Sequence, residues 1–222
     1  MNTFYDALAP RYDALLDKDP RERAIRRRFQ HLVERSVPTG SMLLDMGCGT
    51  GIDAAWFAGR GFRVIAYDIS SGMIDQLRRR CAAEIERGTV VPLAAPFSSF
   101  PSLMSEQPRP DAIVSNYGVL NAFSSPGKFF GAMAPLLGAG RRLVVSTLNP
   151  FYWRDRLQRW WWTALRRSGS PRAIVTHGES LETSRHFHSS IMEAARPHFR
   201  LLAGPSLRHR LGLWRFLVFE RT

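Results

Sequence analysis

The chain has 222 residues, 45% of them hydrophobic, and a formal net charge of +12. Its length suits one sizeable α/β core and is too short for two ordinary domains with linkers, so a single domain over residues 1–222 is expected. No apolar run reaches the roughly 18 residues of a membrane-spanning helix, and the polar N-terminus lacks the pattern of a signal peptide. We therefore expect no transmembrane helix and a cytoplasmic protein.

The basic residues are almost all arginine, because Lys18 and Lys128 are the only lysines. This charge would suit a nucleic acid, an anionic lipid surface or an acidic protein as a partner, and a solvated basic surface without a ligand explains it equally well. The two cysteines, Cys48 and Cys81, have no neighbours that indicate a metal site or a disulfide framework. Composition leaves the oligomeric state open.

Residues 1–36 are predicted to form a helical cap ahead of the first strand. Phe4, Leu8 and Tyr12 recur at helical spacing, which gives an apolar helix face. A second amphipathic helix is expected over residues 21–36, where apolar residues form one stripe and arginines lie elsewhere.

The central stretch of the chain reads Leu43-Leu44-Asp45-Met46-Gly47-Cys48-Gly49-Thr50-Gly51. It predicts a buried strand and a glycine-rich turn, followed by a helix. This unit cradles nucleotide-like ligands, because positions without side chains let the ligand approach the backbone and the helix N-terminus offers free N–H groups. The glycine spacing differs from that of a nicotinamide-cofactor turn, which makes an oxidoreductase the fallback, and an acid at the strand end suits a ligand with an ammonium group.

A second buried strand, residues 63–68, ends in Asp68, 23 residues after Asp45, where a carboxylate can accept both ribose hydroxyls. Here the chain resembles the class I S-adenosylmethionine-dependent methyltransferases, in LLDMGCGTG and in Asp68. The resemblance implies S-adenosyl-L-methionine as cofactor. It also implies a Rossmann-like, doubly wound α/β fold, whose seven-stranded sheet has the order 3-2-1-4-5-7-6, an antiparallel strand 7 and helices on both faces.

The opening segment, Tyr5-Asp6-x-x-Ala9-x-x-Tyr12-Asp13, resembles the "YD..A..YD" start of many small-molecule methyltransferases. In those proteins the segment folds over the bound cofactor. Tyr5 and Tyr12 therefore either close the site or belong to the ordinary apolar helix face described above.

The third strand is expected over residues 89–94, after a helix over 70–86. The resemblance places an acid in the following loop, to bind the adenine amino group, but this chain has Ala94-Ala95-Pro96-Phe97. Either the backbone of Ala94 and Ala95 reads the adenine, or the acid has been dispensed with.

The fourth strand is expected over residues 111–117 and runs into Gly118. Ligands of doubly wound sheets bind at the carboxyl ends of the strands beside the topological switch point, so Asn116, Tyr117 and Gly118 should line the site. Asn116-Tyr117 is not the Asn-Pro-Pro-Tyr signature of amide- and base-directed N-methyltransferases, which disfavours those targets. A helix over 129–137 and strands over 142–147, 199–202 and 215–220 complete the predicted domain.

Substrate identity is expected to lie in an insertion over residues 149–185, where Trp153 and three further tryptophans alternate with arginines along one amphipathic helix. Three interpretations stay open. The helix is a lid packed on the domain, it contacts a lipophilic substrate or a membrane interface, or it binds nucleic acid.

His186 and His188 are candidate general bases, because a neutral imidazole suits proton transfer near pH 7 and two residues two apart on a strand face the same way. Packing or surface histidines explain the pair as well, and they lack the further ligands of a metal site.

Methyl transfer from a sulfonium needs mainly alignment and exclusion of water. Asp45 is assigned to the amino-acid end of the cofactor, Asp68 to the ribose, and the Asn116 carbonyl to the methionine amine. The cofactor-binding residues implied in full are Tyr12, Asp45, Gly47, Cys48, Gly49, Gly51, Asp68, Ile69, Ala94, Ala95, Asn116 and Gly118. The substrate contacts implied are Tyr5, Tyr117 and Trp153.

The sequence thus predicts an enzyme, a cytoplasmic methyltransferase that acts on a small hydrophobic acceptor at oxygen, nitrogen or carbon. An RNA methyltransferase is one alternative, which the charge favours and the lack of an RNA-binding appendage disfavours. A non-catalytic cofactor-binding or membrane-associated partner protein is the other.

Overall fold

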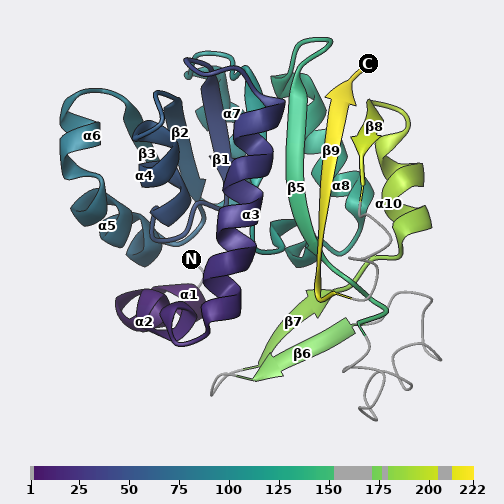
Figure 1. The fold of residues 1–222 in the computed structure, drawn as a ribbon, viewed down its shortest axis with the longest axis horizontal. Helices are drawn as coiled ribbons and strands as arrows, with labels where there is room; N and C mark the ends of the chain where they lie inside the picture. Colours follow the sequence, from purple (N-terminus) through teal and green to yellow (C-terminus); the bar gives the residue numbers. More distant parts are fainter. Residues whose placement is uncertain (1–2, 153–171, 177–179, 205–211) are drawn as a thin grey trace. The chain divides into compact units, whose positions relative to one another are not determined.

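The computed structural model describes residues 3–152, 172–176, 180–204 and 212–222 (Figure 1). The chain divides into two compact units, residues 1–116 and 117–222. The single domain expected for the whole chain stays a prediction.

The main sheet has seven strands in the order β3-β2-β1-β4-β5-β9-β8. Counted within this sheet alone, the order is 3-2-1-4-5-7-6, which confirms the predicted Rossmann-like topology. β9 runs antiparallel to both β5 and β8, as predicted for strand 7.

In the first unit, parallel strands alternate with helices. β1 pairs in parallel with β2 and with β4, and β2 pairs in parallel with β3. The strands are β1 Met42–Met46, β2 Arg63–Asp68, β3 Val90–Ala94 and β4 Ala112–Ser115. The helices are α1 Thr3–Leu8, η1 Ala9–Arg11, α2 Tyr12–Asp17, α3 Pro20–Ser36, α4 Ile52–Ala58, α5 Ser71–Arg80, α6 Ala82–Glu86, η2 Phe97–Ser99 and α7 Phe100–Ser105.

Local sequence explains where α3 begins and what it buries. Asp19 caps the helix by accepting a hydrogen bond from the Arg21 N–H at 2.8 Å, and Pro20 supplies the fixed φ that suits a first helical position. The buried positions Phe29 and Val33 lie one turn apart and pack into the core, while the arginines of the helix are mostly exposed. The predicted helix over residues 21–36 is confirmed.

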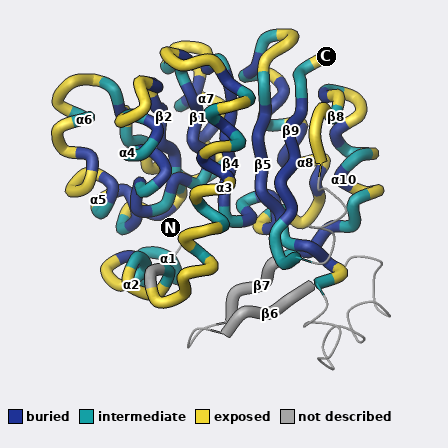
Figure 2. Tube along the Cα trace, in the orientation of Figure 1, coloured by how far each residue is buried: buried dark blue, intermediate teal, exposed yellow. Residues whose placement is uncertain are grey.

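The strands β1, β2 and β4 are buried along most of their length, whereas β3 and α6 are more exposed (Figure 2). Large side chains fill the core, and Phe57, Phe62, Tyr67 and Phe100 are all at most 1% exposed. In Figure 1, β2 points toward α1 and α2, so the N-terminal helices lie at the carboxyl end of this strand.

The second unit has an antiparallel core. Its strands are β5 Arg142–Leu148, β8 Phe199–Ala203 and β9 Trp214–Arg221, with a separate two-stranded sheet of β6 Arg172–Thr176 and β7 Ser180–Ser184. Its helices are η3 Val119–Ala122, α8 Pro126–Met133, η4 Ala134–Leu136 and α10 His188–Ala195. The Phe130 ring contacts those of Phe199 and Phe219, with centroids 5.7 Å and 5.2 Å away.

Three details differ from the predicted elements. The helix expected over 70–86 is two helices, because the backbone leaves helical geometry at Cys81. The fourth strand ends at Ser115 instead of residue 117, because Tyr117 has a φ of 53°. The antiparallel pair β6 and β7 was not predicted, and the helix expected around Trp153 lies outside the described residues.

None of the helices in the described ranges has the length and apolar character needed to cross a bilayer.

Candidate active site

The glycine turn after β1 is tied to the end of β2. The backbone N–H groups of Gly47 and Cys48 both donate to the Tyr67 carbonyl, at 2.8 Å and 3.0 Å. Gly49 and Gly51 have positive φ angles of 55° and 80°. A Cβ atom on Gly51 would lie 2.6 Å from Leu77 Cγ, whereas one on Gly49 would meet no described atom within 4 Å beyond its chain neighbours. Gly51 therefore serves packing, whereas the backbone at Gly49 has open space beside it.

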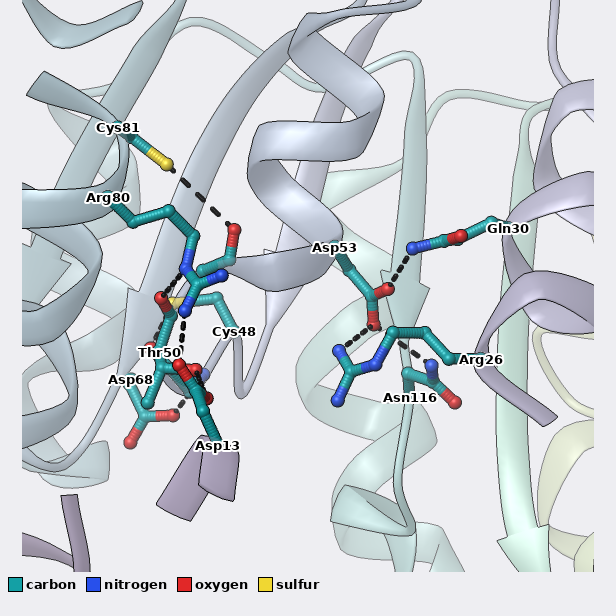
Figure 3. Close-up of polar contacts among 12 residues, drawn as sticks. Asp13, Arg26, Gln30, Cys48, Thr50, Asp53, Asp68, Arg80, Cys81 and Asn116 are labelled. Atoms are coloured by element: carbon teal, nitrogen blue, oxygen red, sulfur yellow. Dashed lines mark hydrogen bonds and ion pairs between the residues drawn. The ribbon is translucent and has the colours of Figure 1, made fainter. Parts of the chain in front are cut away.

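Asp68 is held rigidly at the end of β2 (Figure 3). Its Oδ2 accepts a hydrogen bond from the Gly49 N–H and its Oδ1 accepts one from the Ser70 N–H, both at 2.9 Å. Burial raises the pKa of Asp68, and these backbone donors oppose that shift. A carboxylate oxygen has more than one acceptor position, so the side chain can still accept a pair of hydroxyl groups. Ile69, the next residue, exposes 37% of its surface.

Asp45 is a buried carboxylate, and one of its oxygens lacks a hydrogen-bond donor in the described ranges. It is 2% exposed, and its Oδ2 has no hydrogen-bond partner within the described part of the chain. Burial, and after it the charge of Asp53, holds the pKa of Asp45 well above its usual range, while Arg26 opposes the shift. A buried carboxylate oxygen without a donor is stabilised by a proton or by a cation, so this side chain suits a ligand ammonium group.

Asp53, on α4, gathers three donors, two from α3 and one from the residue after β4 (Figure 3). Its Oδ1 accepts from Gln30 Nε2 at 2.7 Å, and its Oδ2 accepts from Asn116 Nδ2 at 2.9 Å. Arg26 Nη1 pairs with the same Oδ2 at 3.2 Å. The network ties α3 to the helix after the glycine turn and to the end of β4. It therefore fixes the backbone at Asn116, the predicted contact for the methionine amine.

Sequence reasoning missed Arg26, Gln30 and Asp53. The signal was available in part, because Arg26 and Gln30 lie four residues apart on one helix, and Asp53 is a buried acid two residues after Gly51.

In the loop after β3, the backbone groups of Ala95 already make hydrogen bonds within the protein. The Tyr67 hydroxyl donates to the Ala95 carbonyl at 2.9 Å, and the Ala95 N–H lies 3.4 Å from the Asp68 carbonyl. Ala94 is exposed. That the backbone of Ala94 or Ala95 binds the adenine stays a prediction.

Tyr5 and Tyr12, the tyrosines of the opening segment, belong to the first unit. Burial, and then the charge of Asp68, raises the pKa of Tyr5, so this ring lies near the ribose-binding candidate. Tyr12 is half-buried at the start of α2.

In the second unit, Tyr117 and Gly118 turn the chain with positive φ angles of 53° and 74°. The Tyr117 ring stands edge-on to Trp214, with centroids 5.4 Å apart, and a Cβ atom on Gly118 would lie 3.2 Å from Trp214 Cζ3. The indole N–H of Trp214 is buried and has no acceptor among the residues that the structure describes. This pair of rings with a spare donor suits an aromatic ligand that carries oxygen.

The expectation that His186 and His188 share a strand is wrong. β7 ends at Ser184, and His188 is the first residue of α10. His186 is 2% exposed, and its Nε2 lies 3.0 Å from the Phe123 carbonyl, to which it donates. Burial lowers the pKa of His186, which keeps the ring neutral at pH 7. These are the contacts of a packing histidine, and a catalytic role for either residue stays a prediction. Trp153 lies outside the described residues.

Among the described residues, no three His, Cys, Asp or Glu side chains come together as metal ligands would.

Comparison with known proteins supplies a family. A family model described as a methyltransferase domain matches residues 19–194. A ubiquinone biosynthesis O-methyltransferase of Xylella fastidiosa is 30% identical over 122 residues, which cover 55% of this chain and 48% of that protein. A demethylmenaquinone methyltransferase of Renibacterium salmoninarum is 29% identical over 188 residues, which cover 80% of this chain and 74% of that protein. The match thus spans about half the length of the first of these relatives.

Among solved structures, the fold is similar to that of a 1,6-didemethyltoxoflavin-N1-methyltransferase from Burkholderia thailandensis, solved with 1,6-didemethyltoxoflavin and S-adenosylhomocysteine bound. The TM-score is 0.66 at 17% identity, and the match covers 99% of this chain and 86% of that one. Identity this low shows a shared fold.

Proposed function

Because the chain belongs to the methyltransferase domain family, we propose that it transfers the methyl group of S-adenosylmethionine to a small lipophilic acceptor that carries an oxygenated ring. The buried Asp45 oxygen without a donor carries the cofactor part of this proposal. We also propose that residues 1–222 work as one methyltransferase domain in the cytoplasm.

The bound cofactor supplies a methyl group already activated for displacement by its sulfonium. Asp45 and Arg26 would recognise the zwitterionic amino-acid end, since a buried carboxylate suits the ammonium group and a guanidinium with several N–H donors suits the carboxylate. Arg26 lies close enough to Asp45 to lower its pKa, so the two charges are neighbours.

At the ribose, Asp68 would accept both hydroxyl groups, because the Gly49 and Ser70 N–H groups already fix the plane of its carboxylate. The open backbone at Gly49 would allow the close approach, and the Asn116 carbonyl, held by Asp53, would accept from the methionine amine.

For the acceptor, the names of the two relatives support a quinone-related ring. The Tyr117 and Trp214 side chains would contact such a ring, and the Trp214 N–H would donate to one of its oxygens. This contact would orient the acceptor without covalent participation of the protein. His186 and His188 stay the candidates for a base if the acceptor atom must lose a proton.

Calorimetric titration of S-adenosylmethionine and S-adenosylhomocysteine tests the cofactor assignment. We expect micromolar binding, about 8 kcal/mol at 1 µM, and at least about a hundredfold loss in Asp68→Ala. The matched control is Asp75→Ala, since the Asp75 side chain is 58% exposed and pairs with Arg78 on the surface of α5. Wild-type protein that binds neither compound contradicts the proposal.

The acceptor class is tested by methyl transfer from labelled cofactor to demethylated quinols and, in parallel, to aliphatic alcohols and to RNA. Labelled quinol as the main product supports the proposal. Labelling of RNA in its place would favour the RNA methyltransferase alternative.

A further inference from the structure

The segment over residues 3–17, here called the cap segment, makes several polar contacts with the first unit, and its apolar side chains Phe4, Tyr5, Leu8 and Tyr12 are half-buried. Ala9 is its one position that is buried among those described. An element with one fully buried position opens at a lower free-energy cost than a core helix. The polar contacts therefore contribute to how often the cap segment opens.

The first attachment centres on Asp13 (Figure 3). Thr50, in the glycine turn, donates through Oγ1 to Asp13 Oδ1 at 2.5 Å. Arg80, at the end of α5, forms an ion pair with Asp13 Oδ2, and its Nε donates to the Thr50 carbonyl at 3.0 Å. These three residues, with the Thr50 carbonyl as one acceptor, close a ring of contacts that joins α2, the glycine turn and α5.

The second attachment centres on Asp6. Its Oδ1 accepts from the Ser70 hydroxyl at 2.6 Å and from the Gly72 N–H at 2.9 Å. These hydrogen bonds lower the pKa of Asp6, which keeps it charged. Gly72 also allows close backbone approach, since a Cβ atom there would lie 3.1 Å from Asp6 Cα. The cap segment thus docks next to the N–H of Ser70, which binds Asp68.

We propose that Asp6 and Asp13 are positioning residues that fasten the cap segment over the cofactor, and that the opening of these two attachments limits cofactor release. This inference rests on the proposed function for the identity of the ligand. Both attachments end on elements that hold the candidate site: the glycine turn beside Gly49, and the start of α5 beside Asp68. Tyr5, the ring near Asp68, directly precedes Asp6 in the cap segment.

Stopped-flow release of S-adenosylhomocysteine provides the test. We expect Asp13→Asn and Asp6→Asn each to raise the dissociation rate about tenfold and to change the association rate less, because an attachment that is lost favours the open state. Asp75→Asn, on the exposed face of α5, is the matched control and should leave both rates unchanged. Thr50→Val removes only the hydroxyl donor to Asp13 and should reproduce part of the effect.

Trypsin cleavage after Arg11 reports the opening without any ligand, because Arg11 lies exposed in the middle of the cap segment. Faster cleavage in ligand-free Asp13→Asn and Asp6→Asn than in wild type and Asp75→Asn is expected, with unchanged circular dichroism. Wild-type dissociation and cleavage rates in both cap variants would overturn the inference. Wild-type protein that binds no S-adenosylhomocysteine would overturn the proposed function instead, while the cleavage rates still decide whether the two aspartates fasten the cap segment.

Discussion

The two units of the chain differ sharply in charge. Residues 1–116 contain 15 Lys and Arg residues and 14 Asp and Glu residues, whereas residues 117–222 contain 16 and 5. In the first unit, carboxylates such as Asp53 and Asp68 accept several hydrogen bonds around the proposed cofactor site. Nearly all of the net charge of +12 therefore belongs to the second unit, where the cofactor chemistry does not account for it.

In the second unit, a buried amide makes hydrogen bonds in the interior, where the first unit has buried carboxylates. Asn121 is 1% exposed, and its amide donates to the Ser184 carbonyl at 2.6 Å and accepts from the Leu148 N–H at 2.9 Å. The buried polar side chains of the second unit include this amide and the arginines Arg185 and Arg215, whereas those of the first unit include the carboxylates of Asp45 and Asp53. The comparison teaches that the overall basicity is a property of the second unit, and variants in each unit should have different consequences.

The largest expected effect concerns the glycine turn of the first unit. Gly51→Ala should lower the free energy of unfolding by about 2–5 kcal/mol, because a left-handed backbone costs an alanine about 1–2 kcal/mol and the contact with Leu77 adds an overpacking cost. Gly49→Ala should cost only the first of these and yet weaken S-adenosylhomocysteine binding. Urea unfolding and calorimetry separate the two variants, and equal losses of stability would contradict the assigned roles.

In the second unit, Asn121→Ala should lower the free energy of unfolding by about 2–3 kcal/mol, since the Leu148 N–H and the Ser184 carbonyl lose a buried partner. Urea unfolding measures this loss, with the exposed Ser189→Ala as control. The affinity for S-adenosylhomocysteine should stay within about twofold of wild type. A large loss of affinity in the folded variant would mean that the two units do not divide the work as proposed.

Asp45→Asn should act in opposite directions on binding and on stability. Affinity for S-adenosylmethionine should fall about tenfold, because the amide keeps the shape and loses the charge. The raised pKa of Asp45 means that its ionised form opposes folding above the ordinary pKa of the group, with the full penalty reached above the raised pKa. The neutral amide should therefore raise the melting temperature of the ligand-free protein at pH 7.

The pH dependence of binding follows from the same group. Affinity of the wild type for S-adenosylmethionine should increase as the pH rises through the pKa of Asp45, since the ammonium group needs the ionised carboxylate. Asp45→Asn should lack this increase. Calorimetry across pH measures it, and an identical slope in both proteins would remove Asp45 from the ammonium site.

The smallest expected effect concerns the excess charge of the second unit. If it serves an anionic surface, Lys128→Glu combined with Arg141→Glu should reduce flotation with anionic vesicles about threefold at low salt, and 0.5 M NaCl should abolish binding. Arg23→Glu with Arg79→Glu, two equally exposed residues of the first unit, is the matched control. Equal reductions in both variants would indicate a general charge effect, and no flotation of the wild type would favour a solvated surface.

Sequence was sufficient wherever the determinants are local. The strand before Asp45, the glycine turn and the strand before Asp68 each need only a short stretch with a defined spacing, and their order in the sheet followed from the family resemblance. The Asp53 network could not be predicted in the same way. Its donors come from α3 and from the end of β4, so it depends on how distant segments pack.

For His186 and His188, too, contacts between distant segments could not be predicted from the sequence. Alternation of residue types predicted a strand through His186 and His188, but tertiary contacts decide otherwise, since the His186 ring bonds the Phe123 carbonyl and α10 begins at His188. The sequence also does not predict the positive φ of Tyr117, because a tyrosine does not favour that backbone conformation.

The Oδ2 atom of Asp45, which lacks a partner among the described residues, has a consequence for the amount of protein in a cell. A buried carboxylate that gains the ammonium group of a ligand as a counter-charge makes the bound form more stable than the unliganded form, and binding stabilises the fold by mass action. Proteases remove mainly the opened form, so the half-life of the protein should lengthen when S-adenosylmethionine is plentiful and shorten when it is scarce. The abundance of the enzyme would then follow the supply of its own methyl donor.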